Sequence, residues 1–129
     1  MGQKDHSRHV ILVVDDQEDN RELLNIVLSD LGYRVIEACN GLEAIKVATR
    51  ECPDLIIMDL SMPVLDGFAA VRLLREVPQV QNVPVVACTA HDTATHKVQA
   101  LSVGFNEFLT KPIDFRKLDN VLNQFLKAA

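Results

Sequence analysis

Five short apolar runs alternate with five amphipathic segments along this chain, and this alternation restricts the fold more than any other feature of the sequence. Short apolar runs bounded by turn residues predict buried strands, whereas apolar residues spaced three and four apart predict helices that bury one face. The predicted strands span residues 10–14, 34–38, 55–58, 83–88 and 106–110, and the predicted helices span residues 18–31, 41–52, 67–77, 93–103 and 115–126.

Strands that alternate with helices are typical of a parallel sheet, because right-handed crossovers place helices on both of its faces. We therefore expect an α/β fold with a doubly wound, flavodoxin-like sheet of five strands flanked by five helices. The strand order assigned to it is 2-1-3-4-5, which is the order known from folds of this kind.

Each predicted helix has an apolar face that should point to the core. The expected inward residues are Leu23, Leu24, Val27, Leu28 and Leu31 in the first helix, Leu42, Ile45 and Ala48 in the second, Phe68, Val71 and Leu74 in the third, and Phe115, Leu118, Leu122 and Phe125 in the fifth. The fourth helix has the weakest face, with Val98, Leu101 and some alanines. Gly32, Pro53 and Pro78 supply helix stops, and Pro84 is expected near a strand start.

Size and composition indicate one domain. The chain has 129 residues, of which 48% are hydrophobic and 24% charged, so a second folded domain is not expected. We expect a flexible segment over residues 1–8 and a domain over residues 9–127. Because three residues follow Leu126, no output domain is expected.

Charge and cysteine content exclude several functions. The net charge is −5 and the basic residues are scattered, so nucleic-acid binding by this chain is not expected. No signal-peptide core or run of about 18 apolar residues occurs, which predicts a soluble, cytoplasmic protein without membrane contact. Cys39, Cys52 and Cys88 lack metal-ligand spacing and read as free thiols, Cys88 as core packing.

Two of the predicted strands end in carboxylates. Asp15 and Asp16 follow the first strand, and Asp59 follows the third. At the carboxyl ends of neighbouring parallel strands these groups would repel one another unless a cation neutralised them. Alternatively, Asp16 or Asp19 caps the first helix, but capping leaves the other carboxylates unexplained. Asp66, by contrast, reads best as a helix N-cap.

Two more strands end in polar residues at the same edge. Thr89 follows the fourth strand and Lys111 the fifth. Taken singly, Thr89 fits a turn and Lys111 fits a strand end that snorkels to water. Together with the carboxylates they fit phosphoryl transfer to an aspartate, in which Asp59 is the nucleophile and Mg²⁺ is held by Asp16 and Asp59, with Asp15 bound directly or through water.

The chain resembles the receiver domains of two-component response regulators from about His9 to Leu126. The matching motifs are Val13-Val14-Asp15-Asp16, Met58-Asp59-Leu60-Ser61-Met62-Pro63, Asp66-Gly67, Thr89-Ala90 and Lys111-Pro112. The resemblance implies that Asp59 accepts phosphate from a histidine kinase or a histidine phosphotransfer protein. It also implies that Asp15, Asp16 and the Ser61 carbonyl hold Mg²⁺, with Mn²⁺ as a substitute.

The resemblance further assigns switching and output roles. Lys111 would pair with the phosphoryl group, and Thr89 would carry the switch to Phe108, where many members have tyrosine and where core packing is the alternative. Ser61 and His91 would flank the path of the hydrolytic water and tune dephosphorylation. A downstream protein would dock on the face formed by residues 93–126. Beyond its own phosphorylation and dephosphorylation, the chain is not expected to be an enzyme.

Other functions fit the sequence less well. A haloacid-dehalogenase-like phosphatase opens a DxD motif after its first strand, whereas this strand ends Asp15-Asp16-Gln17. A flavin- or nucleotide-binding module needs a phosphate loop there, and residues 17–20 would repel phosphate. A degenerate receiver that serves only as an interaction module is disfavoured because every acidic and basic position is present.

Overall fold

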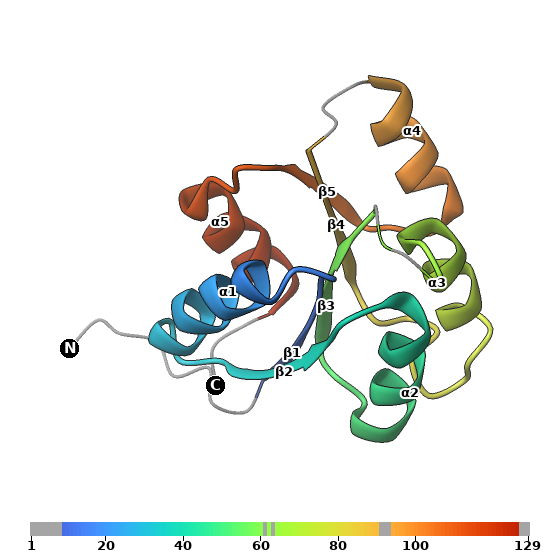
Figure 1. Cartoon of the computed structure of the whole chain (residues 1–129), viewed down its shortest axis with the longest axis horizontal. Helices are drawn as coiled ribbons and strands as arrows, with labels where there is room; N and C mark the ends of the chain where they lie inside the picture. Colours follow the sequence, from blue (N-terminus) through green and yellow to red (C-terminus); the bar gives the residue numbers. More distant parts are fainter. Residues whose placement is uncertain (1–8, 61, 63, 91–93, 127–129) are drawn as a thin grey trace.

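The protein folds as a parallel five-stranded sheet between two layers of helices (Figure 1). The computed structural model describes residues 9–60, 62, 64–90 and 94–126. The elements are β1 (Val10–Val14), α1 (Glu18–Asp30), β2 (Arg34–Ala38), α2 (Gly41–Glu51), β3 (Leu55–Asp59), α3 (Gly67–Leu74), β4 (Val85–Thr89), α4 (Ala94–Val103), β5 (Glu107–Thr110) and α5 (Phe115–Phe125). The strand order β2-β1-β3-β4-β5 confirms the predicted fold class.

The two helical layers follow from the alternation of side chains along the central strands. Leu12 and Val14 of β1 point to one face, where they pack with α2, α3 and α4, whereas Ile11 and Val13 point to the other, where they pack with α1 and α5. Because every second residue changes face, a strand buried on both sides must be apolar throughout. The continuous apolar runs of β1, β3 and β4 are therefore those of the central strands.

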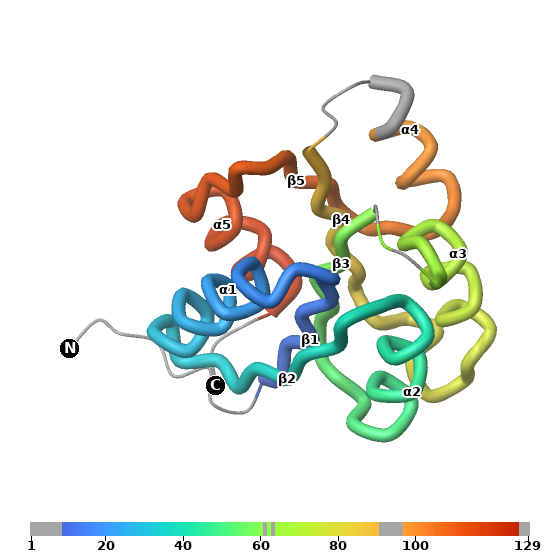
Figure 2. Tube along the Cα trace, in the orientation of Figure 1, coloured from blue at the N-terminus to red at the C-terminus, as the bar shows by residue number. Residues whose placement is uncertain are grey.

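The sheet brings the ends of distant strands together. β1 and β3 pair in parallel from Ile11 with Leu55 to Val14 with Met58, although α1, β2 and α2 separate them in the chain. The trace in Figure 2 shows the chain leaving β1 for α1 and leaving β3 toward α3 at the same edge of the sheet. Residues that follow these strands therefore meet there.

Side chains and backbone conformation fix several helix ends as the sequence predicts. Asp66 caps α3, since its Oδ1 accepts a hydrogen bond from the Ala69 N–H at 2.9 Å. Asn40, which the sequence analysis did not identify as a cap, caps α2 in the same way through the Glu43 N–H at 2.8 Å. Gly32 ends α1 with φ of 100°, a conformation that glycine adopts without a steric penalty.

Several predicted boundaries differ from the structure by one to three residues, and those of β4 and α3 differ most. β4 starts at Val85 rather than at Val83, because the Val83 N–H bonds the Val80 carbonyl in a turn. It extends through Thr89, one residue beyond the predicted end. α3 ends at Leu74 rather than near Pro78, since the N–H groups of Glu76 and Val77 bond carbonyls three residues back instead of four.

The predicted inner faces are wrong at several leucines, valines and phenylalanines. Leu23 is 50% exposed and Val98 is 66% exposed, and Leu42, Leu101 and Phe115 are exposed as well. Helical spacing defines an apolar stripe wider than the surface that the sheet covers, so its edge residues remain at the surface. Within the described residues, every helix is too short or too polar to cross a membrane.

Candidate functional site

The parallel register aligns the ends of β1, β3 and β4 at one edge of the sheet. Asp59 is the last residue of β3 and lies opposite Cys88 of β4, and Thr89 ends β4. Asp15 follows β1 and still bonds β2, because its N–H donates to the Ala38 carbonyl at 3.2 Å. The backbone therefore delivers these three polar side chains to a common place.

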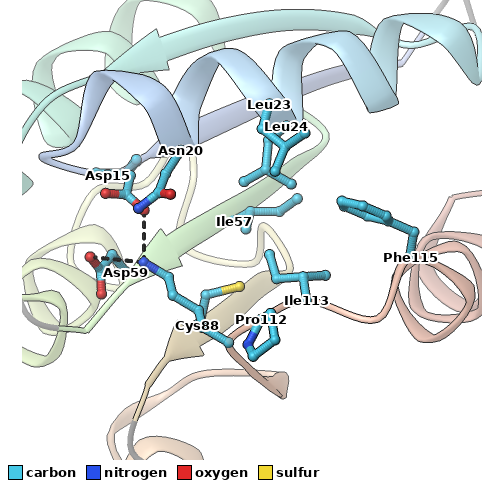
Figure 3. A pocket seen from close by; sticks show the side chains of 12 residues that line it. Asp15, Asn20, Leu23, Leu24, Ile57, Asp59, Cys88, Pro112, Ile113 and Phe115 are labelled. Carbon is cyan, nitrogen blue, oxygen red and sulfur yellow. Dashed lines mark hydrogen bonds and ion pairs between the residues drawn. The ribbon is translucent and has the colours of Figure 1, made fainter.

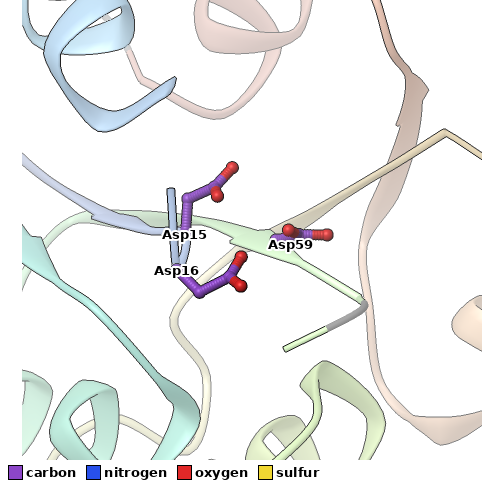
Figure 4. A group of neighbouring side chains, drawn as sticks. All are labelled: Asp15, Asp16 and Asp59. Carbon is purple, nitrogen blue, oxygen red and sulfur yellow. The ribbon is translucent and has the colours of Figure 1, made fainter. Parts of the chain in front are cut away.

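Three carboxylates gather at this edge (Figure 4). One oxygen each from Asp15, Asp16 and Asp59 lies within 4.8 Å of the others. Asp15 and Asp59 are buried and Asp16 is partly exposed. A compact set of oxygen donors with one side open to water suits Mg²⁺, which usually keeps several water ligands, so the donor set fits this ion.

Lys111 joins the cluster from the end of β5. Its Nζ donates to Asp15 Oδ2 at 3.0 Å and to Asp59 Oδ2 at 3.4 Å, the two dashed contacts in Figure 3. Its backbone N–H donates to the Thr89 carbonyl at 2.7 Å, which fixes the start of the β5–α5 loop against β4. Burial acts to lower the pKa of Lys111, but the hydrogen bonds and charges of Asp15 and Asp59 outweigh it and raise the pKa. The ammonium is therefore charged at neutral pH.

Thr89 and Phe108, the two residues of the predicted switch, lie on the neighbouring strands β4 and β5. Thr89 is buried at the same edge as Asp59. Phe108 is partly buried, pairs with Ala87 in the β4–β5 register, and packs against the core on the α2–α4 side of the sheet. Its packing is compatible with both the switch and the core interpretation. Ser61 and His91 lie outside the described residues, as does the segment 1–8 that was predicted to be flexible.

Neither predicted N-cap of α1 is present. The N-cap is Gln17, whose side chain makes no capping bond, so the hypothesis that Asp16 or Asp19 caps this helix is wrong. Instead Asp15 Oδ1 accepts the Gln17 N–H at 2.9 Å. This bond ties Asp15 to the start of α1. Asp16, which does not cap the helix, lies in the acidic cluster.

Gly67 supports the site in a way that the sequence analysis missed. A Cβ at this position would lie 2.7 Å from the Asp59 carbonyl oxygen and 2.9 Å from Leu60 Cα. The N-terminus of α3 therefore sits directly against the end of β3, which a larger residue would prevent. The sequence signal was the Asp66-Gly67 pair, which was interpreted as a helix start and as a motif of the family resemblance, and not as a close contact with β3.

An apolar cavity of about 240 Å³ opens beside Asp59 and Lys111, between α1 and the β5–α5 loop (Figure 3). Its walls include Leu23, Ile57 and Phe115. Cys88 also lines it, buried as predicted, and burial raises the pKa of its thiol to about 12, with Lys111 acting to lower it and the two carboxylates to raise it. The thiol is therefore protonated at neutral pH.

Comparison with known proteins assigns the chain to a family. Residues 11–123 match the response regulator receiver domain. Protein PilH of Pseudomonas aeruginosa is 36% identical over 116 residues, which are 90% of this chain and 96% of PilH. Response regulator PleD of Caulobacter vibrioides is 44% identical over 104 residues, which are 81% of this chain and 23% of PleD.

A solved structure agrees with the fold. The receiver domain of the sensor histidine kinase PA1611 from Pseudomonas aeruginosa PAO1 superposes with a TM-score of 0.84 at 34% identity, covering 91% of this chain and 96% of that chain. That structure has a magnesium ion coordinated in the active site cleft.

These matches show that the chain belongs to the response regulator receiver domains. It is thus a phosphoacceptor domain of two-component signalling with a CheY-like fold, and the phosphatase interpretation is not supported. The chain spans about a quarter of PleD, because such domains also occur within longer proteins.

Proposed function

We propose that Asp59 is the phosphoacceptor of this receiver domain. The observation that carries the proposal is the Lys111 ammonium, which bridges Asp59 and Asp15 within the acidic cluster. A carboxylate at a strand end, held beside a fixed cation in a cluster that is partly exposed at Asp16, is suited to act as a nucleophile. Asp15 is tied to the surrounding backbone and side chains through both oxygens, because Oδ1 accepts the Gln17 N–H and Oδ2 accepts the Lys111 ammonium.

The transfer breaks one bond to phosphorus and makes another. An Asp59 oxygen attacks the phosphorus of a phosphohistidine, the P–N bond breaks, and the imidazole leaves with the electron pair and takes up a proton from water. Lys111 then moves its hydrogen bond from the carboxylate to a phosphoryl oxygen, and the Thr89 hydroxyl donates to another. These roles are supported by the position of Thr89 at the end of β4 and by the hydrogen bond from Lys111 to Asp59.

The acidic cluster is proposed to hold Mg²⁺, with Mn²⁺ as a substitute. Asp15, Asp16 and Asp59 would be the side-chain ligands, and the Ser61 carbonyl, outside the described residues, the backbone ligand. A bound divalent cation would neutralise the carboxylates and the incoming phosphoryl oxygens. Self-phosphorylation and self-dephosphorylation that depend on Mg²⁺ are part of this proposal, as is tuning of dephosphorylation by Ser61 and His91.

The partners are proposed to be a histidine kinase or histidine phosphotransfer protein upstream and a protein that binds α4, β5 and α5 downstream. A polar hollow of about 290 Å³ lies on the downstream face, and its lining includes Lys97 of α4, Phe108 of β5 and Lys117 of α5. The hollow offers cationic and aromatic contacts beside the proposed switch residue. The cytoplasmic location expected from the sequence stays a prediction.

The test is intact-mass measurement after incubation with acetyl phosphate and Mg²⁺. The wild-type protein should gain one phosphoryl group that alkali removes, and Asp59→Asn should gain none. Asp30→Asn makes the same chemical change at an exposed position at the end of α1 and should be phosphorylated like the wild type. A stable phosphoryl group on Asp59→Asn would contradict the assignment.

A further inference from the structure

Arg21 links three elements beside the acidic cluster. It lies in α1, and its largely buried side chain reaches both the end of β1 and the edge strand β2. Nη1 donates to the backbone carbonyl of Asp15 at 2.8 Å, and Nε donates to Glu37 Oε1 at 3.1 Å. One guanidinium thus holds the start of α1 against two neighbouring strands.

Glu37 is itself fixed in place from both sides. Its second oxygen, Oε2, accepts a hydrogen bond from Asn25 Nδ2 at 2.9 Å, and Asn25 Oδ1 accepts the Ser29 hydroxyl at 2.9 Å. Because both carboxylate oxygens have donors, Glu37 cannot rotate without losing a bond. We call the residues Ser29, Asn25, Glu37 and Arg21 the α1–β2 hydrogen-bond chain.

The α1–β2 hydrogen-bond chain ends at the peptide group between Asp15 and Asp16, two of the proposed metal ligands. The Asp15 carbonyl belongs to the peptide between Asp15 and Asp16, and a peptide group is planar. A hydrogen bond to its oxygen therefore restricts the orientation of this peptide plane, and with it the direction of the Asp16 backbone. The Asp15 side chain is held separately by the Gln17 N–H and by Lys111, so the contact of Arg21 bears mainly on the placement of Asp16.

We propose that Arg21 is a positioning residue for the metal site, which orients the Asp15–Asp16 peptide so that Asp16 faces Asp59 before a cation arrives. The inference rests on the proposed function, because it needs these carboxylates to bind Mg²⁺. Groups that orient metal ligands through hydrogen bonds commonly change metal affinity tenfold to a hundredfold when they are removed. Asp16 is partly exposed, so it depends on such support.

The charge of Arg21 should weaken Mg²⁺ binding, whereas its positioning of Asp16 should strengthen it. These opposite effects on Mg²⁺ affinity make the inference testable. A guanidinium near a cation site repels the cation, although Glu37 offsets part of that charge. If Arg21 acted through its charge alone, removing it would tighten Mg²⁺ binding. If it only fastened α1 to β2, removing it would lower the stability of the fold and leave the affinity of the folded protein unchanged. Positioning predicts weaker binding.

The experiment measures Mg²⁺ binding by calorimetric titration without any phosphodonor. Arg21→Met keeps much of the apolar stem but has no donor and no charge. Its dissociation constant for Mg²⁺ should rise about tenfold or more. In the metal-free protein, the amide resonances of Asp16 and Gln17 should also shift, since the peptide plane is released.

Two further variants provide the controls. Arg50→Met removes an arginine whose salt bridge with Glu51 lies exposed on α2, so it matches the loss of charge and should leave the dissociation constant within about threefold of wild type. Arg21→Lys keeps one cationic donor and should recover part of the affinity. It also serves if Arg21→Met does not fold.

Each outcome decides the matter. Equal or tighter Mg²⁺ binding by folded Arg21→Met, with measurable binding by the wild type, overturns the positioning role alone. Absence of Mg²⁺ binding by the wild type overturns the metal site of the proposed function and this inference with it. Weaker binding by Arg21→Met, partial recovery by Arg21→Lys and unchanged binding by Arg50→Met support the role.

Discussion

The helices α5 and α4 follow adjacent strands but attach to the sheet very differently. α5 buries Leu118, Val121 and Leu122 in the core that it shares with α1. Among the described side chains of α4, at residues 97–103, Ala100 alone is buried, and Val98 and Leu101 face water. The well-anchored α5 thus lies on one face of the sheet, and the weakly anchored α4 lies on the other.

The contrast indicates how one site can be both rigid and responsive. The carboxylates and Lys111 lie among β1, α1 and the start of α5, where buried side chains resist movement. Thr89 ends the strand that leads toward α4, where few apolar contacts oppose a shift. We therefore expect the proposed phosphorylation of Asp59 to change α4 and to leave the acidic cluster in place, provided that the two states are stabilised differently.

The largest expected effect tests the anchoring itself. Leu118→Ala in α5 removes a fully buried side chain and should lower the free energy of unfolding by about 2–5 kcal/mol. Leu101→Ala in α4 makes the same change at a side chain that is 44% exposed and should cost less than about 1 kcal/mol. Urea unfolding of both variants measures the difference. Equal losses would remove the basis for the comparison.

The next largest effect is a loss of stability at alkaline pH, caused by the Cys88 thiol in the core that α1 and α5 share. Folding raises the pKa of Cys88 from 9.0 to about 12, so above pH 9.0 the unfolded chain releases a proton that the native protein keeps. The free energy of unfolding should then fall as pH rises toward 12, by up to about 1.4 kcal/mol per pH unit from this group. Below pH 9.0 the contribution is constant.

Cys88→Val should flatten that decline in urea unfolding series between pH 8 and 11, while leaving the slope below pH 9.0 unchanged. Folding also raises the pKa values of Tyr33 and Lys111, so both residues also make the free energy of unfolding fall as pH rises. Both remain in the variant, so their contributions cancel when the wild type and Cys88→Val are compared. A decline of equal steepness in both proteins would contradict the burial of the thiol.

The smallest expected effect is a redistribution of amide chemical shifts. With Mg²⁺ and beryllofluoride, a phosphoryl mimic, shifts in the wild type should spread from Asp59 through β4, α4 and β5. In Thr89→Ala they should contract toward the site, because no hydroxyl carries the change. Thr110→Ala removes the hydroxyl opposite Thr89 in the register and should keep the wild-type spread. An equal spread in all three proteins would rule out the route through Thr89.

The comparison of the predicted with the observed helices and strands shows which features of this fold can be predicted from the sequence. Strands and helices were predicted nearly throughout, because periodicity and turn residues act locally. The exposed faces of Leu23, Leu42 and Val98 were predicted wrongly, because the width of a buried stripe depends on the neighbouring elements. The end of β4 shifted to Thr89 for a similar reason, since its pairing with Thr110 of β5 continues the ladder.

The sequence by itself determined the element order, the parallel sheet and the residues that reach its carboxyl edge, because strand ends and their carboxylates can be read from neighbours in the chain. The tertiary structure alone decided how these residues are held. Three contacts join residues on different elements: Lys111 bridges Asp15 and Asp59, Gly67 lies against the end of β3, and Arg21 donates a hydrogen bond to the Asp15 carbonyl. Such contacts arise when packed helices and strands meet, so no local pattern encodes them.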